Sequence, residues 1–251
     1  MYLRFGPVCI SSITMLTTED CRPERGRVKI NVIDLSPFIR PCYAEDRACL
    51  KSSAQAAVAV VAAGLPALGV ERMDPMYLEH VSASQAGLIM EFNNTQVRGL
   101  RHCRVLDLQR AGPRMTVQLQ CSVVLTGYYV LSGKLLIFPI QGSGPYKITI
   151  RDIVVKVSLE TVERKKGSER YWSVVSWKHT AHVLTSVGYH FQNLFNGDEA
   201  LARPVTHFAN KNWRDIFTEV SPPIVSAIVG RIVQQTAHLF DKVPLTQLSL
   251  E

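Results

Sequence analysis

The side chains that could perform chemistry are scattered along this sequence and form no recognised catalytic pattern. Among the seven histidines, His179 and His182 are three residues apart on an expected strand, which places them on opposite faces. Gly142-Ser143-Gly144 does not match a nucleophile elbow, because residue 141 is Gln and the segment is typical of a strand-to-strand turn. The sequence contains no His-Glu-x-x-His zinc motif and no Walker loop. We therefore expect no catalytic residue, no metal ligand and no cofactor, and the protein is not predicted to be an enzyme.

The six cysteines are the next candidates for chemistry, and none forms a Cys-x-x-Cys pair. This spacing gives no support to zinc-ribbon or thioredoxin-type proteins. Cys42 and Cys49 enclose a short loop, residues 43–48. The residues alone leave open whether these two cysteines form a disulfide or remain free thiols.

Cys103 and Cys121 flank a turn predicted at residues 111–114. A three-residue turn centred on Gly112 would place the two cysteines opposite each other. A two-residue turn at 112–113 instead pairs apolar residues with apolar residues, Leu106 with Leu119 and Leu108 with Val117. Strand register follows the buried face, so we favour the second turn, which leaves the cysteines apart. Whether they pair stays open.

The elements that must position these residues follow from hydrophobic periodicity. Residues 45–65 show apolar side chains at helical spacing, and Gly64 and Pro66 end the helix. From residue 87 the period becomes two, and residues 115–125 alternate between apolar and polar as in a half-buried strand. Turns are predicted at 132–133, 142–145 and in the charged segment 164–170, and a bulge is predicted near 151–152. The sheet is therefore expected to be a meander of unusually long antiparallel strands.

The helical period returns from Thr206 onward, and Pro222-Pro223 must break or kink that helix. Residues 221–230 carry no charge, and a helix that is apolar on nearly all sides must be enclosed. The simplest enclosure is the long sheet curving around it. The fold class is therefore predicted as α+β, a long hydrophobic helix wrapped by a highly curved antiparallel β-sheet.

Composition limits the kinds of partner that we expect for this protein. A hydrophobic share of 47% excludes disorder for the chain as a whole, and a net charge of +7 is modest for 251 residues. The basic segment 164–170 has no interleaved aromatic residues, so we expect no nucleic-acid binding. The uncharged segment 52–70 is rich in Ala and is interrupted by Gly and Pro, which favours a buried amphipathic helix over stable membrane insertion.

Several segments in order resemble the insect takeout and juvenile-hormone-binding protein family, over about residues 35–245. The matching segments are Leu35 to Cys42 with Cys49-Leu50-Lys51, Gly64 to Val70 with Met73 to Met76, Val97 to Leu100, Gly127 to Tyr129 with Gly133 to Leu136, Pro139 to Gly144, Asn193 to Asp198 and Asn210 to Trp213. The resemblance implies a secreted, non-enzymatic carrier with an elongated apolar tunnel, and it implies a Cys42–Cys49 disulfide. The chain has no Cys after residue 121, so it is more similar to the takeout branch.

The N-terminal segment falls outside this resemblance. Residues 5–18 only loosely match a signal peptide, because they lack a small-x-small cleavage site. We therefore expect an irregular segment, residues 1–34, followed by a single domain, residues 35–251. Asn93-Asn94-Thr95 is a glycosylation sequon at Asn93 that matters if the chain is secreted.

The expected function is extracellular transport of a small hydrophobic ligand, a juvenile hormone-like terpenoid, a fatty acid or another lipid, by a monomer. The alternative is a membrane-docking lipid-transfer or lipopolysaccharide-binding module. Tyr128 and Tyr129 are candidates to donate a hydrogen bond to a ligand oxygen, although either could simply be an amphipathic core residue. The candidate tunnel residues are Val61, Leu65, Leu68, Tyr128, Tyr129, Leu136, Phe138, Ile140, Trp213, Phe217, Ile224 and Ile228.

Overall fold

The computed structural model describes residues 38–85 and 87–250. The irregular segment expected at 1–34, with its signal-like run, lies outside the described residues. All described residues belong to the structural unit 35–251, and the account below concerns this unit alone.

One helix precedes the sheet. Helix α1 (Arg47–Ala63) begins where the Asp46 side chain accepts a hydrogen bond from the backbone N–H of Cys49 at 2.9 Å, and it ends at Gly64. It packs against β3 (Arg104–Ala111) through one face, on which Leu50 and Ala62 are buried. The segment 52–70 is thus mostly an amphipathic helix lying on the sheet, followed by the short 3-10 turn η1 (Pro66–Leu68).

The sheet is antiparallel throughout and runs in the order β1-β2-β4-β5-β6, with β3 paired to β4. The remaining strands are β1 (Met76–Gln85), β2 (Leu88–Arg98), β4 (Arg114–Leu135), β5 (Phe138–Lys166) and β6 (Glu169–Phe191). β4, β5 and β6 contain 22, 29 and 23 residues, which confirms the meander of long strands. The predicted bulge is confirmed near Asp152, and the charged segment 164–170 forms a hairpin tip.

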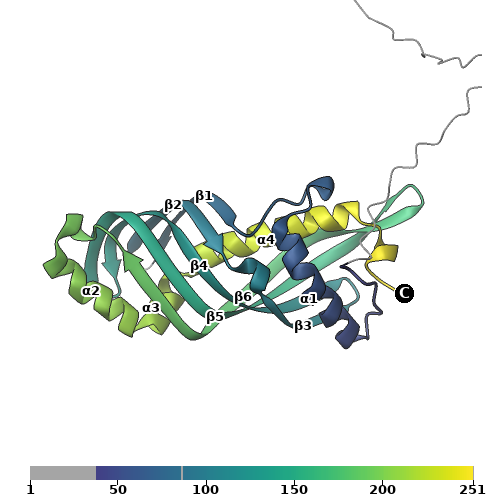
Figure 1. Cartoon of the computed structure of the whole chain (residues 1–251), viewed down its shortest axis with the longest axis horizontal. Helices are drawn as coiled ribbons and strands as arrows, with labels where there is room; N and C mark the ends of the chain where they lie inside the picture. The colour runs from purple at the N-terminus through teal and green to yellow at the C-terminus, as the bar shows by residue number, and fades with distance from the viewer. Residues whose placement is uncertain (1–37, 86, 251) are drawn as a thin grey trace, which may run out of the picture. The chain divides into compact units, whose positions relative to one another are not determined.

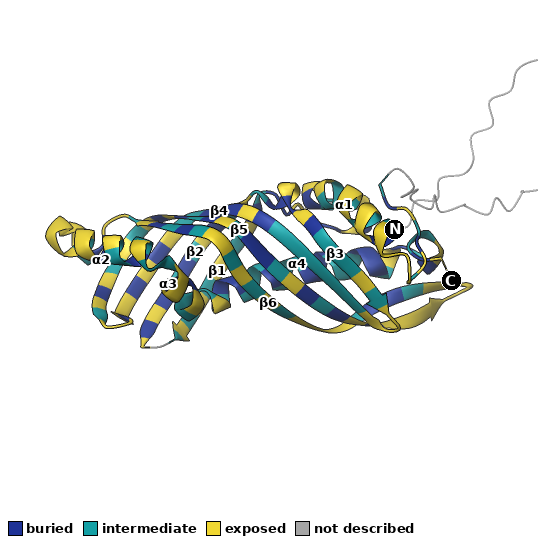
Figure 2. Ribbon diagram, turned by 90° about the horizontal axis from the view of Figure 1, so that it is seen from below, coloured by how far each residue is buried: buried dark blue, intermediate teal, exposed yellow. Residues whose placement is uncertain are grey.

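Three helices follow the sheet: α2 (Glu199–Lys211), α3 (Trp213–Val220) and α4 (Pro222–Lys242). α3 and α4 meet at a bend of 63°, where Pro222 begins α4 as the repeated prolines require. The curled sheet wraps around α4 (Figure 1), and buried and exposed positions alternate along the strands (Figure 2). This arrangement confirms the predicted fold class.

Within the described part of the chain, no single helix is both long and apolar enough to cross a membrane. α3 and α4 together reach that length and composition only as a bent pair. Seven residues of α4, including Val225, Val229 and Val233, are buried inside the protein.

Two predicted turns are wrong, because the glycines in them mark close backbone approaches instead. β4 continues through Gly133 to Leu135, and a side chain at Gly133 would collide with the backbone of Gly87. β5 likewise runs straight through residues 142–145. A Cβ at Gly144 would lie 2.7 Å from the Gln192 carbonyl oxygen, since the chain after β6 crosses there.

Both pairs of cysteines discussed above form disulfides, Cys42 with Cys49 and Cys103 with Cys121. The two-residue turn at 112–113 is present, and Leu108 lies opposite Val117 as expected. A bulge between Val105 and Asp107 then shifts the register by one residue, so that Val105 rather than Leu106 faces Leu119. The register favoured from the sequence is therefore wrong beyond this bulge, and the shift brings Cys103 to Cys121.

Candidate functional site

The larger of two apolar cavities along α4 has a volume of about 330 Å³, lies between α1, strands β3 to β5 and α4, and is open toward the surface on one side, where the exposed Arg40 lines it. Its wall is almost entirely apolar. β4 and β5 contribute alternate side chains, such as Val117 and Val155, and α4 contributes one face from Val225 to Phe240. The inward face of residues 115–125, visible as alternation in the sequence, forms much of this wall.

A smaller cavity, of about 80 Å³, lies toward the start of α4 and is bounded by β2, β4, β5, β6 and all three C-terminal helices. Ile150, Val225 and Ile228 line both cavities. On α4, Val225 and Ile228 lie where the two sets of lining residues meet, so the cavities are placed end to end along this helix.

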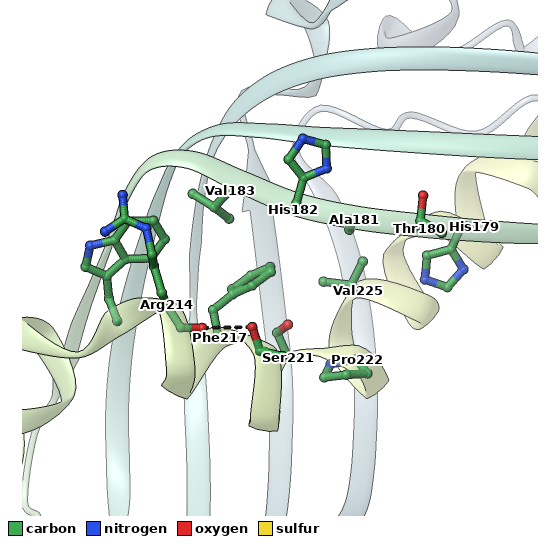
Figure 3. Close-up of a pocket in the computed structure, with 12 residues that line it drawn as sticks. His179, Thr180, Ala181, His182, Val183, Arg214, Phe217, Ser221, Pro222 and Val225 are labelled. Atoms are coloured by element: carbon green, nitrogen blue, oxygen red, sulfur yellow. Dashed lines mark hydrogen bonds between the residues drawn. The ribbon is translucent and has the colours of Figure 1, made fainter.

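A surface cleft of about 390 Å³ lies between β6 and the junction of α3 with α4 (Figure 3). Val225 lines this cleft as well as both cavities, and Phe217 lines the cleft and the smaller cavity. His179 and His182 point to opposite sides of β6, as their spacing predicts. No group of three or more His, Cys, Asp or Glu able to hold a metal ion occurs within residues 38–85 and 87–250.

The structure brings five of the predicted tunnel residues together along α4. Val61 lines the larger cavity, Ile140 and Ile224 the smaller one, Phe217 the smaller cavity and the cleft, and Ile228 both cavities. These residues come from α1, β5, α3 and α4, and the curled sheet brings the first two to the C-terminal helices.

The other apolar candidates lie elsewhere. Leu68, the last residue of η1, is buried in the hydrophobic core, and the partly buried Leu65 packs against this core. Leu136 is 37% exposed at the β4–β5 hairpin tip, and Phe138 packs on Phe208 with ring centroids 4.7 Å apart. Trp213 lines the surface cleft, where the Arg214 guanidinium lies 4.2 Å from its ring centroid. None of these five is among the residues that line the two interior cavities.

Tyr128 and Tyr129, the two candidate hydrogen-bond donors to a ligand, lie in different surroundings. Neighbouring strand residues point to opposite faces, and Tyr128 is 58% exposed on the outer face. Tyr129 is buried, but its hydroxyl donates to the Gln192 carbonyl oxygen at 2.6 Å. Burial raises the pKa of Tyr129 to about 12. Neither side chain lines the two cavities.

Tyr189 is a phenol that the sequence reasoning missed. It lines the smaller cavity, and its buried hydroxyl has no hydrogen-bond partner among the described residues. Burial raises the pKa of Tyr189, so the hydroxyl remains a proton donor. The Asn210 side chain fixes this part of β6, because it bonds both the N–H and the C=O of Tyr189 at 2.8 and 3.0 Å. Tyr189 differs from the other inward-facing residues of β6 only in this hydroxyl without a described partner, and the sequence does not reveal such a feature.

The sequon lies within β2 rather than in a loop. Asn93 is half-buried, and its Oδ1 lies 2.6 Å from Nδ1 of His80 on β1. Thr95 is fully buried, with its hydroxyl 2.7 Å from that of Tyr146. Glycosylation at Asn93 stays a prediction.

Comparison with known proteins agrees with this architecture. Residues 26–250 match the model of the haemolymph juvenile hormone binding protein family. The circadian clock-controlled protein daywake of Drosophila melanogaster is 26% identical over 226 residues, which cover 83% of this chain and 85% of that protein. The juvenile hormone-binding protein of Manduca sexta is 26% identical over 90 residues, 35% of this chain and 39% of that protein.

The crystal structure of Epiphyas postvittana Takeout 1 superposes with a TM-score of 0.83 at 25% sequence identity. The match covers 85% of this chain and 100% of that one. Sequence, family model and fold therefore agree, and the chain belongs to the haemolymph juvenile hormone binding protein family, as its resemblance to takeout-like proteins predicts.

Proposed function

We propose that this protein is an extracellular carrier that binds a small hydrophobic ligand in the two cavities along α4. The ligand class is a juvenile hormone-like terpenoid, a fatty acid or another lipid. The observation that carries the proposal is the end-to-end placement of two apolar cavities, with Val225 and Ile228 common to both.

Physical chemistry supports this use of the interior. Protein cores are normally packed as densely as organic crystals, so an apolar space of about 330 Å³ is too large to be a packing defect. Moving a ligand's hydrocarbon chain from water into this space stabilises the complex by about 0.8 kcal/mol for each CH₂ group. A few polar groups suffice to orient such a ligand, and the unpartnered hydroxyl of Tyr189 is one of them.

The relatives support the same ligand class. One is a juvenile hormone-binding protein, and another, from Schistocerca gregaria, is a putative beta-carotene-binding protein, 24% identical over 115 residues. Two disulfides favour an oxidising compartment, which is consistent with secretion. The apolar walls favour binding without chemical transformation, and we propose that the carrier works as a monomer.

Native mass spectrometry of the protein secreted from insect cells, before and after organic extraction, tests this function. We expect a bound lipid of defined mass that extraction removes. A protein that is empty as purified, and that takes up neither terpenoids nor fatty acids afterwards, would refute the carrier function.

A further inference from the structure

The charged residues around the larger cavity all have the same sign. Arg40 and Arg110 line it, and no Asp or Glu occurs among its described lining residues. Arg40 is exposed, whereas Arg110 is partly buried on β3. The cavity thus combines a long apolar wall with positive charge alone.

Arg110 has no acidic partner within residues 38–85 and 87–250. Its guanidinium carbon lies 5.0 Å from the ring centroid of Trp172, and one N–H donates to the hydroxyl of Ser249. None of the ion pairs among the described residues includes Arg110. A guanidinium has five N–H donors, so most of those on Arg110 have no partner in the part of the chain that the structure describes.

The position of Arg110 defines one end of the cavity. Trp172 packs edge-on against Phe240 near the end of α4, with ring centroids 5.3 Å apart, whereas Ile228 lies near the start of that helix. The C-terminal segment covers this end, since Ser249 pairs with Cys42 and the backbone N–H of Leu250 donates to the Cys42 carbonyl. Positive charge and the smaller cavity therefore lie at opposite ends of the larger cavity.

A cation beside an apolar wall is poorly compensated, because it loses hydration and gains no opposite charge. Stacking on an indole face compensates part of this loss and leaves the guanidinium edge available. A carboxylate is the group that this edge binds best, through two parallel hydrogen bonds. An ester, an alcohol or a hydrocarbon cannot supply the missing negative charge.

We propose that Arg110 is the headgroup site for a long-chain carboxylic acid whose hydrocarbon tail lies along α4 toward Ile228. This inference rests on the proposed carrier function and makes long-chain acids the preferred members of its ligand class. Trp172 and Ser249 position the guanidinium. The apolar cavity wall, which includes Val117 on β4 and Val233 on α4, contacts the hydrocarbon chain of the ligand.

Displacement of the neutral fluorescent probe N-phenyl-1-naphthylamine by dodecanoic acid and by its methyl ester, at neutral pH, tests the inference. The two lipids share the same chain, so the ratio of their affinities isolates the contribution of the carboxylate. Arg110→Met removes the charge and keeps an unbranched side chain, two atoms shorter than that of Arg, and Arg110→Gln removes the charge and keeps a polar end group. Arg104→Met is the matched control, since Arg104 is exposed on the same strand and bonds Gln120 at 2.6 Å.

We expect either neutral variant to lower the acid-to-ester affinity ratio by about tenfold or more, the effect of losing hydrogen bonds to a charged group. Arg104→Met should leave the ratio unchanged. Circular dichroism establishes which variants fold, and one folded neutral variant is enough to decide. An unchanged ratio would overturn the assignment of Arg110 while leaving the carrier function intact. If the unaltered protein binds neither the probe nor the two lipids, the carrier function itself fails.

Discussion

The fully buried side chain of Gln235 accepts a hydrogen bond from the backbone N–H of Glu71, with 2.7 Å between Oε1 and N. Glu71 follows η1, and its carboxylate also accepts from the guanidinium of Arg231, one turn earlier on α4. These two contacts attach α4 to the segment that leaves α1. Because α4 forms one wall of both cavities, they also fix the dimensions of the interior.

Replacing Gln235 should therefore lower the stability of the protein more than is usual for a polar residue. We expect Gln235→Ala to lower the free energy of unfolding by about 2–3 kcal/mol, because it leaves a small void and an unpaired backbone N–H. Gln234→Ala is the control, since Gln234 is the exposed neighbour of Gln235 on α4. Denaturant unfolding measures both variants, and equal destabilisation by the two would contradict this role for Gln235.

The disulfide between Cys103, just before β3, and Cys121 on β4 leads to a second prediction about stability. Removing it by Cys103→Ser with Cys121→Ser should lower the free energy of unfolding by about 3 kcal/mol, the chain-entropy estimate for a loop of this size. The Cys42–Cys49 bridge spans 7 residues rather than 18, so its removal should cost less. Denaturant unfolding of the two double variants checks this order, and a larger loss at Cys42–Cys49 would show that loop size does not decide it.

The fold was largely predictable because its main features are periodic and local. Alternation over 115–125 predicts a strand with one buried face, and Pro222-Pro223 predicts the break before α4. The glycines at 133, 142 and 144 misled the prediction, because Gly is equally suited to a turn and to a close backbone crossing. The bulge that pairs Cys103 with Cys121 depends on tertiary packing, which no local pattern contains.

The site was less predictable than the fold. Helical periodicity places Ile224 and Ile228 on the apolar face of a helix, but it does not distinguish a residue that packs in the core from one that lines a cavity. Tyr128 and Tyr189 are alike in sequence terms, and only the structure places one outside and the other against a cavity with an unused hydroxyl. In the sequence, Arg110 does not differ from the other basic residues. Only the structure shows that it has no acidic partner within the described residues.

Two buried tyrosines allow structural and ligand-binding roles to be separated. Tyr129→Phe removes a hydrogen bond to Gln192 and should lower the free energy of unfolding by about 1 kcal/mol without changing ligand affinity. Tyr189→Phe removes no internal hydrogen bond, so it should leave stability nearly unchanged and weaken binding of a ligand whose carbonyl or epoxide oxygen it meets. Thermal unfolding and titration with a terpenoid ester measure both effects. The reverse pattern would exclude Tyr189 from ligand binding.

Stability should fall at alkaline pH. Burial raises the pKa of Tyr129 and of Tyr146 to about 12, although the hydrogen bond with Thr95 opposes the shift at Tyr146. Between pH 10 and 12 the unfolded chain loses these protons while the folded protein keeps them, so deprotonation favours unfolding as the pH rises. Denaturant unfolding at several pH values should show this loss above pH 10, and Tyr146→Phe should reduce it. A pH-independent free energy from 9 to 12 would contradict the expected burial of these phenols.

Ile228 lines both cavities, so a large side chain there should obstruct the interior where the two meet. We expect Ile228→Trp to weaken binding of a long hydrophobic ligand by about tenfold or more, because the indole occupies space that several CH₂ groups of the ligand would fill. Ile89→Trp makes the same change at a position that is 54% exposed on β2, and it should leave affinity unchanged. Fluorescent-probe titration measures the affinities, and the melting temperature of each variant identifies any loss of folding. Normal affinity in a folded Ile228→Trp protein would mean that the ligand does not pass this point, and it would confine the binding site to one cavity.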